Sequence, residues 1–227
     1  MRPRMIIFDM DGVITRIKNS WEYLHEYFTP GFDRSYSKIL LKRYLKGEIS
    51  YPRWIAEEIK MLIERRGRGI RKEEIYEAYS KVEIYEEIIE LINIARRSSL
   101  NNFAIVSGGV SILARRVGEI LGIREVYANH LIFDQRRYLV PGGIPLVEPL
   151  SKDRVIGNIL SKLGIDNRET IFIGDSIWDL PGFRVVGYPI ALNCVECKKD
   201  EEEADLVHVT SHRELVFLVY KLLKNSS

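Results

Sequence analysis

The chain has 227 residues and a formal net charge of +2; 46% of its residues are hydrophobic and 29% are charged. This balance is typical of a globular protein with a buried core, and it excludes a disordered chain, a coiled-coil rod and a collagen-like repeat. The near-zero charge argues against general nucleic-acid binding. No apolar stretch is long enough to span a membrane, and the apolar run at residues 5–8 is too short for a signal peptide. We therefore expect a soluble, cytoplasmic protein, monomeric or homodimeric, with reduced cysteines.

The first element is a strand at residues 5–8, which are all apolar and end at the polar turn Asp9-Met10-Asp11-Gly12. A uniformly apolar run of this length suits a strand buried on both faces, as in a parallel sheet. Residues 16–94 lack a clear strand and carry helical patterns. We therefore predict that they form an inserted helical cap domain over the strand ends, in a position to act as a lid. Its expected helices cover residues 35–46, 51–64, 71–80 and 83–97.

Residues 95–227 alternate strands with helices and, together with residues 1–15, form the predicted α/β catalytic core. The apolar runs at 103–106 and 171–173 end at Ser107-Gly108-Gly109 and Gly174-Asp175-Ser176. This alternation indicates βαβ units and a Rossmann-like parallel sheet with helices on both faces. Ser151 is the expected N-cap of one helix, and a capping box starts another at Ser211. The remaining expected elements are a hairpin within 127–140, strands at 189–192 and 206–209, and helices at 110–121, 151–163 and 211–223.

Carboxylates gather at two of the strand ends. Asp9 and Asp11 lie two residues apart after the first strand, and Asp175 and Asp179 follow a later one. Ligands bind beyond the carboxyl ends of the strands in open parallel sheets, so we expect these side chains to share one site. Four neighbouring carboxylates stay ionised together only near a cation. Oxygen ligands without histidine or cysteine favour Mg²⁺ as that cation.

Groups of the opposite character accompany the carboxylates. Ser107 offers a hydroxyl, Gly108 and Gly109 offer N–H groups before a helix, and Lys152 adds a positive charge near the start of another helix. A metal on one side and these donors on the other suit a phosphoryl group. Each feature alone has a simpler explanation, namely a turn, a flexible loop or a surface lysine. Their joint occurrence at strand ends and helix starts favours the phosphoryl site.

These segments resemble the four motifs of the haloacid dehalogenase superfamily of phosphohydrolases, and the insertion resembles its C1-type helical cap. The resemblance covers essentially the whole chain. Within the superfamily, the stretches at 106–109 and 127–132 are similar to the phosphoserine phosphatase branch. The segments that carry the superfamily resemblance are Asp9-Met10-Asp11-Gly12-Val13, Ser107, Lys152 and Gly174-Asp175-Ser176-Ile177-Trp178-Asp179.

The resemblance implies a mechanism and a role for each residue. Asp9 would attack phosphorus to form an aspartyl-phosphate, and Asp11 would protonate the leaving oxygen and then activate water. Mg²⁺ would be held by the Asp9 carboxylate, the Asp11 backbone carbonyl and Asp175, while Asp179 would support the metal's water shell or orient Lys152. The phosphoryl oxygens would be bound by Ser107, the Gly108 amide and Lys152.

The sequence departs from the phosphoserine phosphatase pattern at several positions. Gly12 and Val13 replace a serine and a threonine, and Trp178 replaces an asparagine. Glu22 and Arg53 are the nearest candidates for the substrate-binding glutamate and arginine of the cap. The aromatic residues of the expected cap either pack in its core or line a less polar pocket. They are Trp21, Tyr23, Phe28, Tyr44, Tyr51 and Trp54.

We therefore expect a phosphomonoesterase for a small phosphorylated metabolite, with phosphoserine as the leading candidate. The alternatives are a phosphotransferase or mutase of the same superfamily and a non-catalytic protein that binds a phosphorylated metabolite. Cys194 and Cys197 have C-x-x-C spacing, but they supply only half a zinc site and are expected to be incidental. The four histidines are expected to be structural, and the charged run at 198–203 is expected to be a solvated loop or a helix start.

Overall fold

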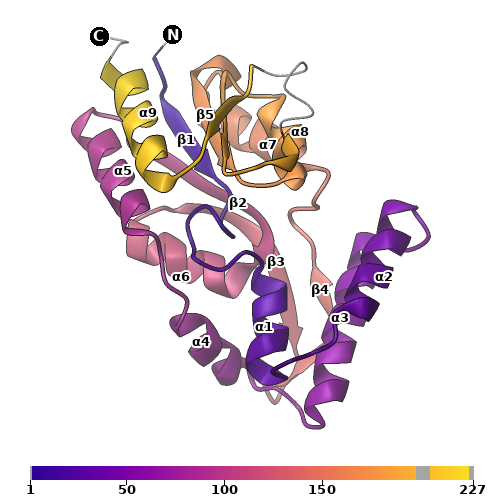
Figure 1. Ribbon diagram of the computed structural model, residues 1–227. Coiled ribbons are helices and arrows are strands. Elements are labelled where there is room, and N and C mark those ends of the chain that lie inside the picture. Colours follow the sequence, from indigo (N-terminus) through magenta and orange to yellow (C-terminus); the bar gives the residue numbers. More distant parts are fainter. Residues whose placement is uncertain (1, 198–204, 225–227) are drawn as a thin grey trace.

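A mostly parallel sheet forms the centre of the computed structural model, which describes residues 2–197 and 205–224 (Figure 1). In this part of the chain the sheet has seven strands in the order β4-β3-β2-β1-β5-β6-β7. All neighbours pair in parallel except β3 and β4, which form the predicted antiparallel hairpin. The expected Rossmann-like α/β fold is confirmed. The strands are β1 (Met5–Phe8), β2 (Asn102–Val110), β3 (Glu125–Phe133), β4 (Leu139–Ile144), β5 (Thr170–Gly174), β6 (Tyr188–Leu192) and β7 (Val207–Val209).

Helices cover both faces of the sheet because side chains alternate along each buried strand. Met5 and Ile7 of β1 belong to one apolar core with residues of α7 and α8, whereas Ile6 and Phe8 belong to the other core with residues of α5, α6 and α9. All four β1 side chains are fully buried. The helices are α1 (Ser20–Phe28), α2 (Ser35–Leu45), α3 (Tyr51–Arg66), α4 (Lys72–Ser80), α5 (Glu86–Arg97), α6 (Ser111–Leu121), α7 (Lys152–Leu163), α8 (Leu180–Phe183) and α9 (His212–Lys224).

The first four helices lie between β1 and β2 in the chain, at the end of the molecule away from both termini in Figure 1. Helix α3 packs against β4, while α5 packs against α9 beside the sheet. The expected domain boundary at residue 94 therefore falls inside α5. The division of the chain into a core and a helical cap stays a prediction.

Every predicted helix is present within three residues of its expected ends, but α1 and the short α8 were not predicted. Two expected caps differ in detail. Ser151 occupies the N-cap position of α7 without a side-chain hydrogen bond to the helix. The Glu214 carboxylate accepts from the N–H and hydroxyl of Thr210 instead of reaching back to Ser211, whose hydroxyl still accepts from the Glu214 N–H at 3.2 Å.

The expectation of reduced cysteines is wrong. Cys194 and Cys197 follow β6 and form a disulfide. Their Cα atoms are 5.4 Å apart, within the range that a disulfide spans without moving the backbone. Both side chains are buried in the core that includes α7 and α8. The charged run at 198–203 lies outside the described residues. Among the helices that are described, none is long and apolar enough to cross a membrane.

Candidate active site

The strand register brings three of the predicted site residues to one edge of the sheet. Phe8, the last residue of β1, pairs with Ile105 of β2 and with Ile173 of β5. Asp9, directly after β1, is therefore level with Val106 and Gly174, one residue before Ser107 on β2 and Asp175 after β5. Because β1, β2 and β5 are parallel, these side chains share the carboxyl edge of the sheet, where ligands bind in open α/β folds.

A buried lysine lies between two of the carboxylates. The Lys152 Nζ is 2.9 Å from Asp9 Oδ1 and donates a 2.5 Å hydrogen bond to Asp179 Oδ1. All three residues are buried, and α7 supplies the lysine at its first residue. Burial alone would lower the pKa of Lys152, but the charges of Asp179 and Asp9 outweigh it and raise the pKa. The lysine is therefore positively charged and fixed against Asp9.

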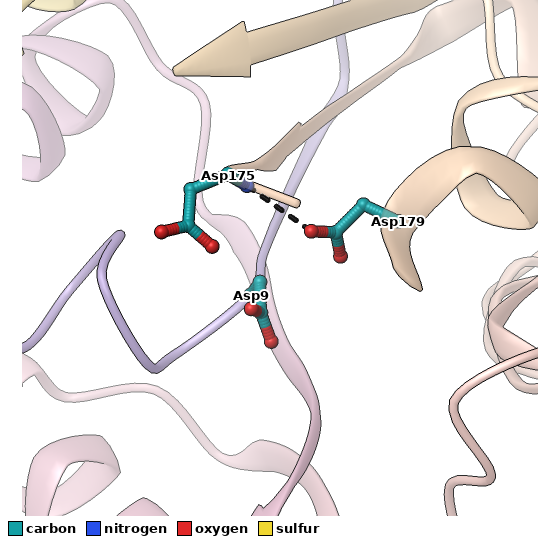
Figure 2. A group of neighbouring side chains, drawn as sticks. All are labelled: Asp9, Asp175 and Asp179. Carbon is teal, nitrogen blue, oxygen red and sulfur yellow. Dashed lines mark hydrogen bonds between the residues drawn. The ribbon is translucent and has the colours of Figure 1, made fainter. Parts of the chain in front are cut away.

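Asp9, Asp175 and Asp179 form a compact acidic group (Figure 2). One carboxylate oxygen of each lies within 4.8 Å of the other two. Burial, opposed by Lys152 and reinforced by the neighbouring carboxylates, raises the pKa of Asp9 to about 8. Burial likewise raises the pKa of Asp175. Such crowding of hard oxygen donors fits a divalent cation, which would relieve the repulsion among them.

The donors around Asp179 separate its role from that of the other two carboxylates. Its Oδ1 accepts from Lys152, and its Oδ2 accepts from the Asp175 N–H, the Ser176 N–H and the Ser176 hydroxyl. Both oxygens are thus engaged by protein donors. Asp175 has instead one exposed partner, the Lys18 ammonium at 2.8 Å. Asp9 and Asp175 are therefore the carboxylates best placed to bind a cation.

Gly12 lies against Asp175, in a backbone conformation that favours glycine. Its φ of +80° is in the left-handed region, and a Cβ atom would collide with the Asp175 carboxylate. A serine at this position, as in the phosphoserine phosphatase pattern, would need a strained backbone and a displaced Asp175 side chain in this chain.

Asp11 points away from the acidic group, toward the first residue of α1. Its Oδ2 accepts from the Ser20 N–H at 2.8 Å and from the Ser20 hydroxyl at 2.7 Å, whereas its buried Oδ1 has no hydrogen-bond partner in the described residues. Burial raises the pKa of Asp11 to about 6, although the hydrogen bonds from Ser20 oppose the shift. A carboxyl group with a free oxygen and a pKa near neutrality can both give and take a proton.

Ser20 is a site residue that the sequence analysis missed. Its side chain is fully buried, and its hydroxyl also accepts from the Val110 N–H at 3.1 Å. A signal for the start of α1 was present in the sequence. Asn19 is the N-cap, and its Oδ1 accepts from the N–H groups of Trp21 and Glu22.

The segment 107–109 interrupts the pairing of β2 with β3. Val106 pairs with Tyr127 and Val110 with Asn129, so three residues on β2 face a single residue on β3. This bulge takes the segment out of the regular ladder. The Ser107 hydroxyl accepts from the Gly109 N–H at 3.0 Å.

Asn129 holds this bulge in place, a role that the sequence analysis did not assign to it. The fully buried side chain donates to the Gly108 carbonyl at 2.8 Å, to the Val147 carbonyl and to the Tyr51 hydroxyl. Its Oδ1 accepts from the N–H groups of Leu146 and Val147. The Gly108 carbonyl also accepts from Trp21 and Tyr51. The bulge is therefore held by β3 and by two of the helices that precede β2.

A cavity of about 470 Å³ opens over these groups. Its lining joins the strand-end residues Asp9, Asp11, Ser107, Gly108, Lys152 and Asp175 to residues of α1, α2 and α3. Trp178 and Glu22 also line it, whereas Arg53 does not and instead pairs with Glu57 on α3. Of the six aromatic residues expected in the cap, Trp21, Tyr51 and Trp54 line this cavity.

Comparison with known proteins identifies relatives of the whole arrangement. The family described as haloacid dehalogenase-like hydrolase matches residues 3–187. A phosphoserine phosphatase from Archaeoglobus fulgidus is 27% identical over 89% of this chain, and the chain spans only 56% of that protein. A phosphoserine phosphatase from Methanocaldococcus jannaschii is 23% identical, with 90% of this chain and 92% of the relative covered.

Solved structures share the fold. A HAD family hydrolase from Salmonella enterica serovar Typhi superposes with a TM-score of 0.77 at 17% identity, covering 96% of this chain and 72% of the other. A phosphoserine phosphatase with a phospho-aspartyl intermediate analogue superposes with a TM-score of 0.75 at 21% identity, covering 96% and 99%. At these identities the likeness shows the fold alone.

Proposed function

Because the chain belongs to the haloacid dehalogenase-like hydrolase family, we propose that it is a Mg²⁺-dependent phosphomonoesterase that hydrolyses a small phosphorylated metabolite. One observation carries the proposal: Asp9 has Lys152 at 2.9 Å and Asp175 in the same acidic group, and Asp11, whose Oδ1 has no hydrogen-bond partner in the described residues, lines the same cavity. A nucleophile, a cation site and a proton carrier therefore line one space.

The reaction has two displacements. An Asp9 oxygen attacks phosphorus, and the bond to the ester oxygen breaks as Asp11 gives that oxygen its proton, which yields an alcohol and an aspartyl-phosphate. Asp11, now a carboxylate, takes a proton from water as that water attacks phosphorus. Inorganic phosphate leaves and the Asp9 carboxylate is restored.

The surrounding residues stabilise charge during both displacements. Lys152 neutralises negative charge beside Asp9, and Asp179 fixes the position of the lysine. Ser107 and the Gly108 amide would bind phosphoryl oxygens from the bulge of β2. Asp9, the Asp11 carbonyl and Asp175 would hold Mg²⁺, which when bound supplies positive charge that favours the ionised form of Asp9 and shields it from the phosphate.

Phosphoserine is the first substrate to test, because the curated relatives are named phosphoserine phosphatases. The experiment measures phosphate release from phosphoserine and other phosphomonoesters with and without Mg²⁺, with Asp9→Asn as the control. We expect Mg²⁺-dependent release by the natural chain and a loss of at least about a thousandfold in Asp9→Asn, whose amide cannot act as the nucleophile.

Retention of near-natural turnover by a folded Asp9→Asn protein would remove Asp9 from the nucleophile role. Transfer of the phosphoryl group to an added alcohol in preference to water would instead support a phosphotransferase. Absence of turnover from every ester, with Mg²⁺ bound, would overturn the proposed phosphomonoesterase in favour of a binding protein.

A further inference from the structure

A second polar cluster, separate from the strand ends, lines the same cavity. Its centre is Glu58 of α3, which is only 9% exposed. The Ser37 hydroxyl of α2 donates to Glu58 Oε2 at 3.0 Å, the Trp54 indole N–H donates to Oε1 at 3.1 Å, and His25 Nε2 of α1 lies 3.3 Å from Oε2. Three helices thus present donors to one buried carboxylate.

This cluster has acceptor capacity left for a ligand. A carboxylate accepts about four hydrogen bonds, and Glu58 Oε1 receives only one from the described residues. His25 is 4% exposed and stacked on Phe32, and its buried Nδ1 has no partner in the described residues. In the neutral tautomer that donates from Nε2 to Glu58, Nδ1 is a further acceptor in this cluster. A ligand that completes it must therefore bring hydrogen-bond donors.

The charges around the cavity agree with this polarity. The basic side chains that line its helical part, Arg34 and Lys38, are on exposed residues, and Arg34 is paired with Glu22 at 3.0 Å. Neither is paired with Glu58, whose one basic partner among the described residues is His25. The wall of the same cavity also contains apolar and aromatic residues, including Ile55, Leu41 and Trp21.

We propose that Glu58 selects the leaving alcohol, and that the preferred substrates are phosphomonoesters whose alcohol carries an ammonium group at the end of an apolar chain. The inference rests on the proposed phosphomonoesterase activity. Lys152 and the strand-end residues would bind the phosphoryl group, the apolar wall would contact the chain, and Glu58 would pair with the ammonium. A cavity of about 470 Å³ is large enough for such an extended ligand.

The test compares matched esters that differ only in the terminal ammonium: 2-aminoethyl against ethyl phosphate, 3-aminopropyl against propyl phosphate, and 5-aminopentyl against pentyl phosphate. For the natural chain we expect kcat/KM for the aminoalkyl ester to exceed that of its partner by about tenfold in at least one pair, mainly through KM. In Glu58→Gln this ratio should fall to near one, because the glutamine keeps the size of the side chain but loses its charge.

Glu57→Gln is the matched control, since Glu57 is the neighbouring carboxylate of α3 and does not line the cavity. It should preserve the ratio. A purely structural Glu58, joining α1, α2 and α3, would lower kcat/KM equally for both members of a pair and leave the ratio intact, which would overturn the inference. A natural chain without preference in all three pairs would also overturn it. Failure to hydrolyse any ester, including p-nitrophenyl phosphate, would instead overturn the proposed activity and the inference with it.

Discussion

The two aspartates of the first motif have opposite surroundings although they lie two residues apart. Asp9 is in contact with Lys152 and belongs to the acidic group, whereas Asp11 is hydrogen-bonded to the N-terminus of α1. An anionic nucleophile needs a cation beside it, and a general acid needs a pKa near neutrality. The different neighbours of the two carboxylates thus suit them to different roles.

Ser20→Ala tests whether Ser20 controls the pKa of Asp11. The change removes one hydrogen bond that lowers the pKa of Asp11. Asp11 must be protonated to act as the acid, so activity is lost as the pH rises through its pKa. We expect the alkaline limb of the kcat/KM profile to move up by about one pH unit, because a hydrogen bond to a charged group is worth about 1.5–3 kcal/mol and one pKa unit about 1.4 kcal/mol.

Ser35→Ala is the control for this change. Ser35 also starts a helix and also bonds an aspartate through its N–H and hydroxyl, but that aspartate is the exposed Asp33. Removal of the Ser35 hydroxyl should leave the alkaline limb of the kcat/KM profile at the same pH. A Ser20→Ala enzyme that is slower at every pH, with an unmoved limb, would show that Ser20 contributes only to folding or packing.

At the scale of elements, α1 connects the helical part of the cavity to the turn after β1, which contains Asp11, and to the bulge at residues 107–109. Ser20 bonds Asp11, and the Trp21 indole donates to the Gly108 carbonyl at 3.0 Å. The Tyr79 hydroxyl donates to the Ser20 carbonyl at 3.0 Å, so α4 fixes the same helix end. Any movement of α1 would therefore affect both Asp11, the proposed acid, and the bulge at 107–109, the proposed phosphate-binding segment.

Asn129→Ala tests the second connection, through β3. The change removes all five hydrogen bonds of this buried side chain and leaves their partners in the interior unsatisfied. We expect the free energy of unfolding to fall by about 3 kcal/mol or more, measured as a lower urea midpoint, because each buried unsatisfied group costs about 1–3 kcal/mol.

Asn102→Ala is the comparison, since that side chain makes a single exposed hydrogen bond to the Arg4 carbonyl. Its midpoint should stay close to that of the natural chain. An equally small effect of Asn129→Ala would mean that water replaces the lost hydrogen bonds and that the bulge is held by Trp21 and Tyr51 alone.

The strands and the polar turns that follow them were predictable because each depends on a short continuous stretch of sequence. Residues 5–8 are uniformly apolar, and Asp9 follows them directly, so one stretch of chain reveals both the strand and the site. Helix α1 was missed although Asn19 marks its start and its buried side chains lie on one face. Asn129 and Glu58 could not be assigned, because their partners lie far away in the sequence and only the folded chain brings them together.

At the scale of the whole molecule, the fold gathers more carboxylates at the site than one buried lysine, Lys152, can neutralise. The carboxylates of Asp9, Asp11 and Asp175 all have raised pKa values, chiefly through burial. This arrangement therefore lowers the stability of the folded chain, and a bound cation would restore it.

The cytoplasmic location and the monomeric or homodimeric state expected from composition stay predictions.

The pH dependence of stability follows from these shifts. A carboxyl group with a pKa of 3.8 in the unfolded chain and about 6 or about 8 in the folded chain binds more protons when folded, so the free energy of unfolding falls as the pH rises through this interval. For Asp11 alone the loss is on the order of 3 kcal/mol. Without Mg²⁺, we expect the melting temperature to decline from pH 4 to pH 8. Added Mg²⁺ should reverse the decline at pH 8.

Asp175→Asn separates the cation from the general effect of pH. The change removes a charge that raises the pKa of both Asp9 and Asp11, so at pH 8 in a chelator the variant should melt about 2–4 °C above the natural chain. Mg²⁺ should then add little, because a ligand has been lost. Asp166→Asn is the contrasting control: hydrogen bonds from Arg168 lower the pKa of Asp166 to about 2, so its removal should not raise the melting temperature. A full Mg²⁺ response in Asp175→Asn would mean that the cation binds elsewhere.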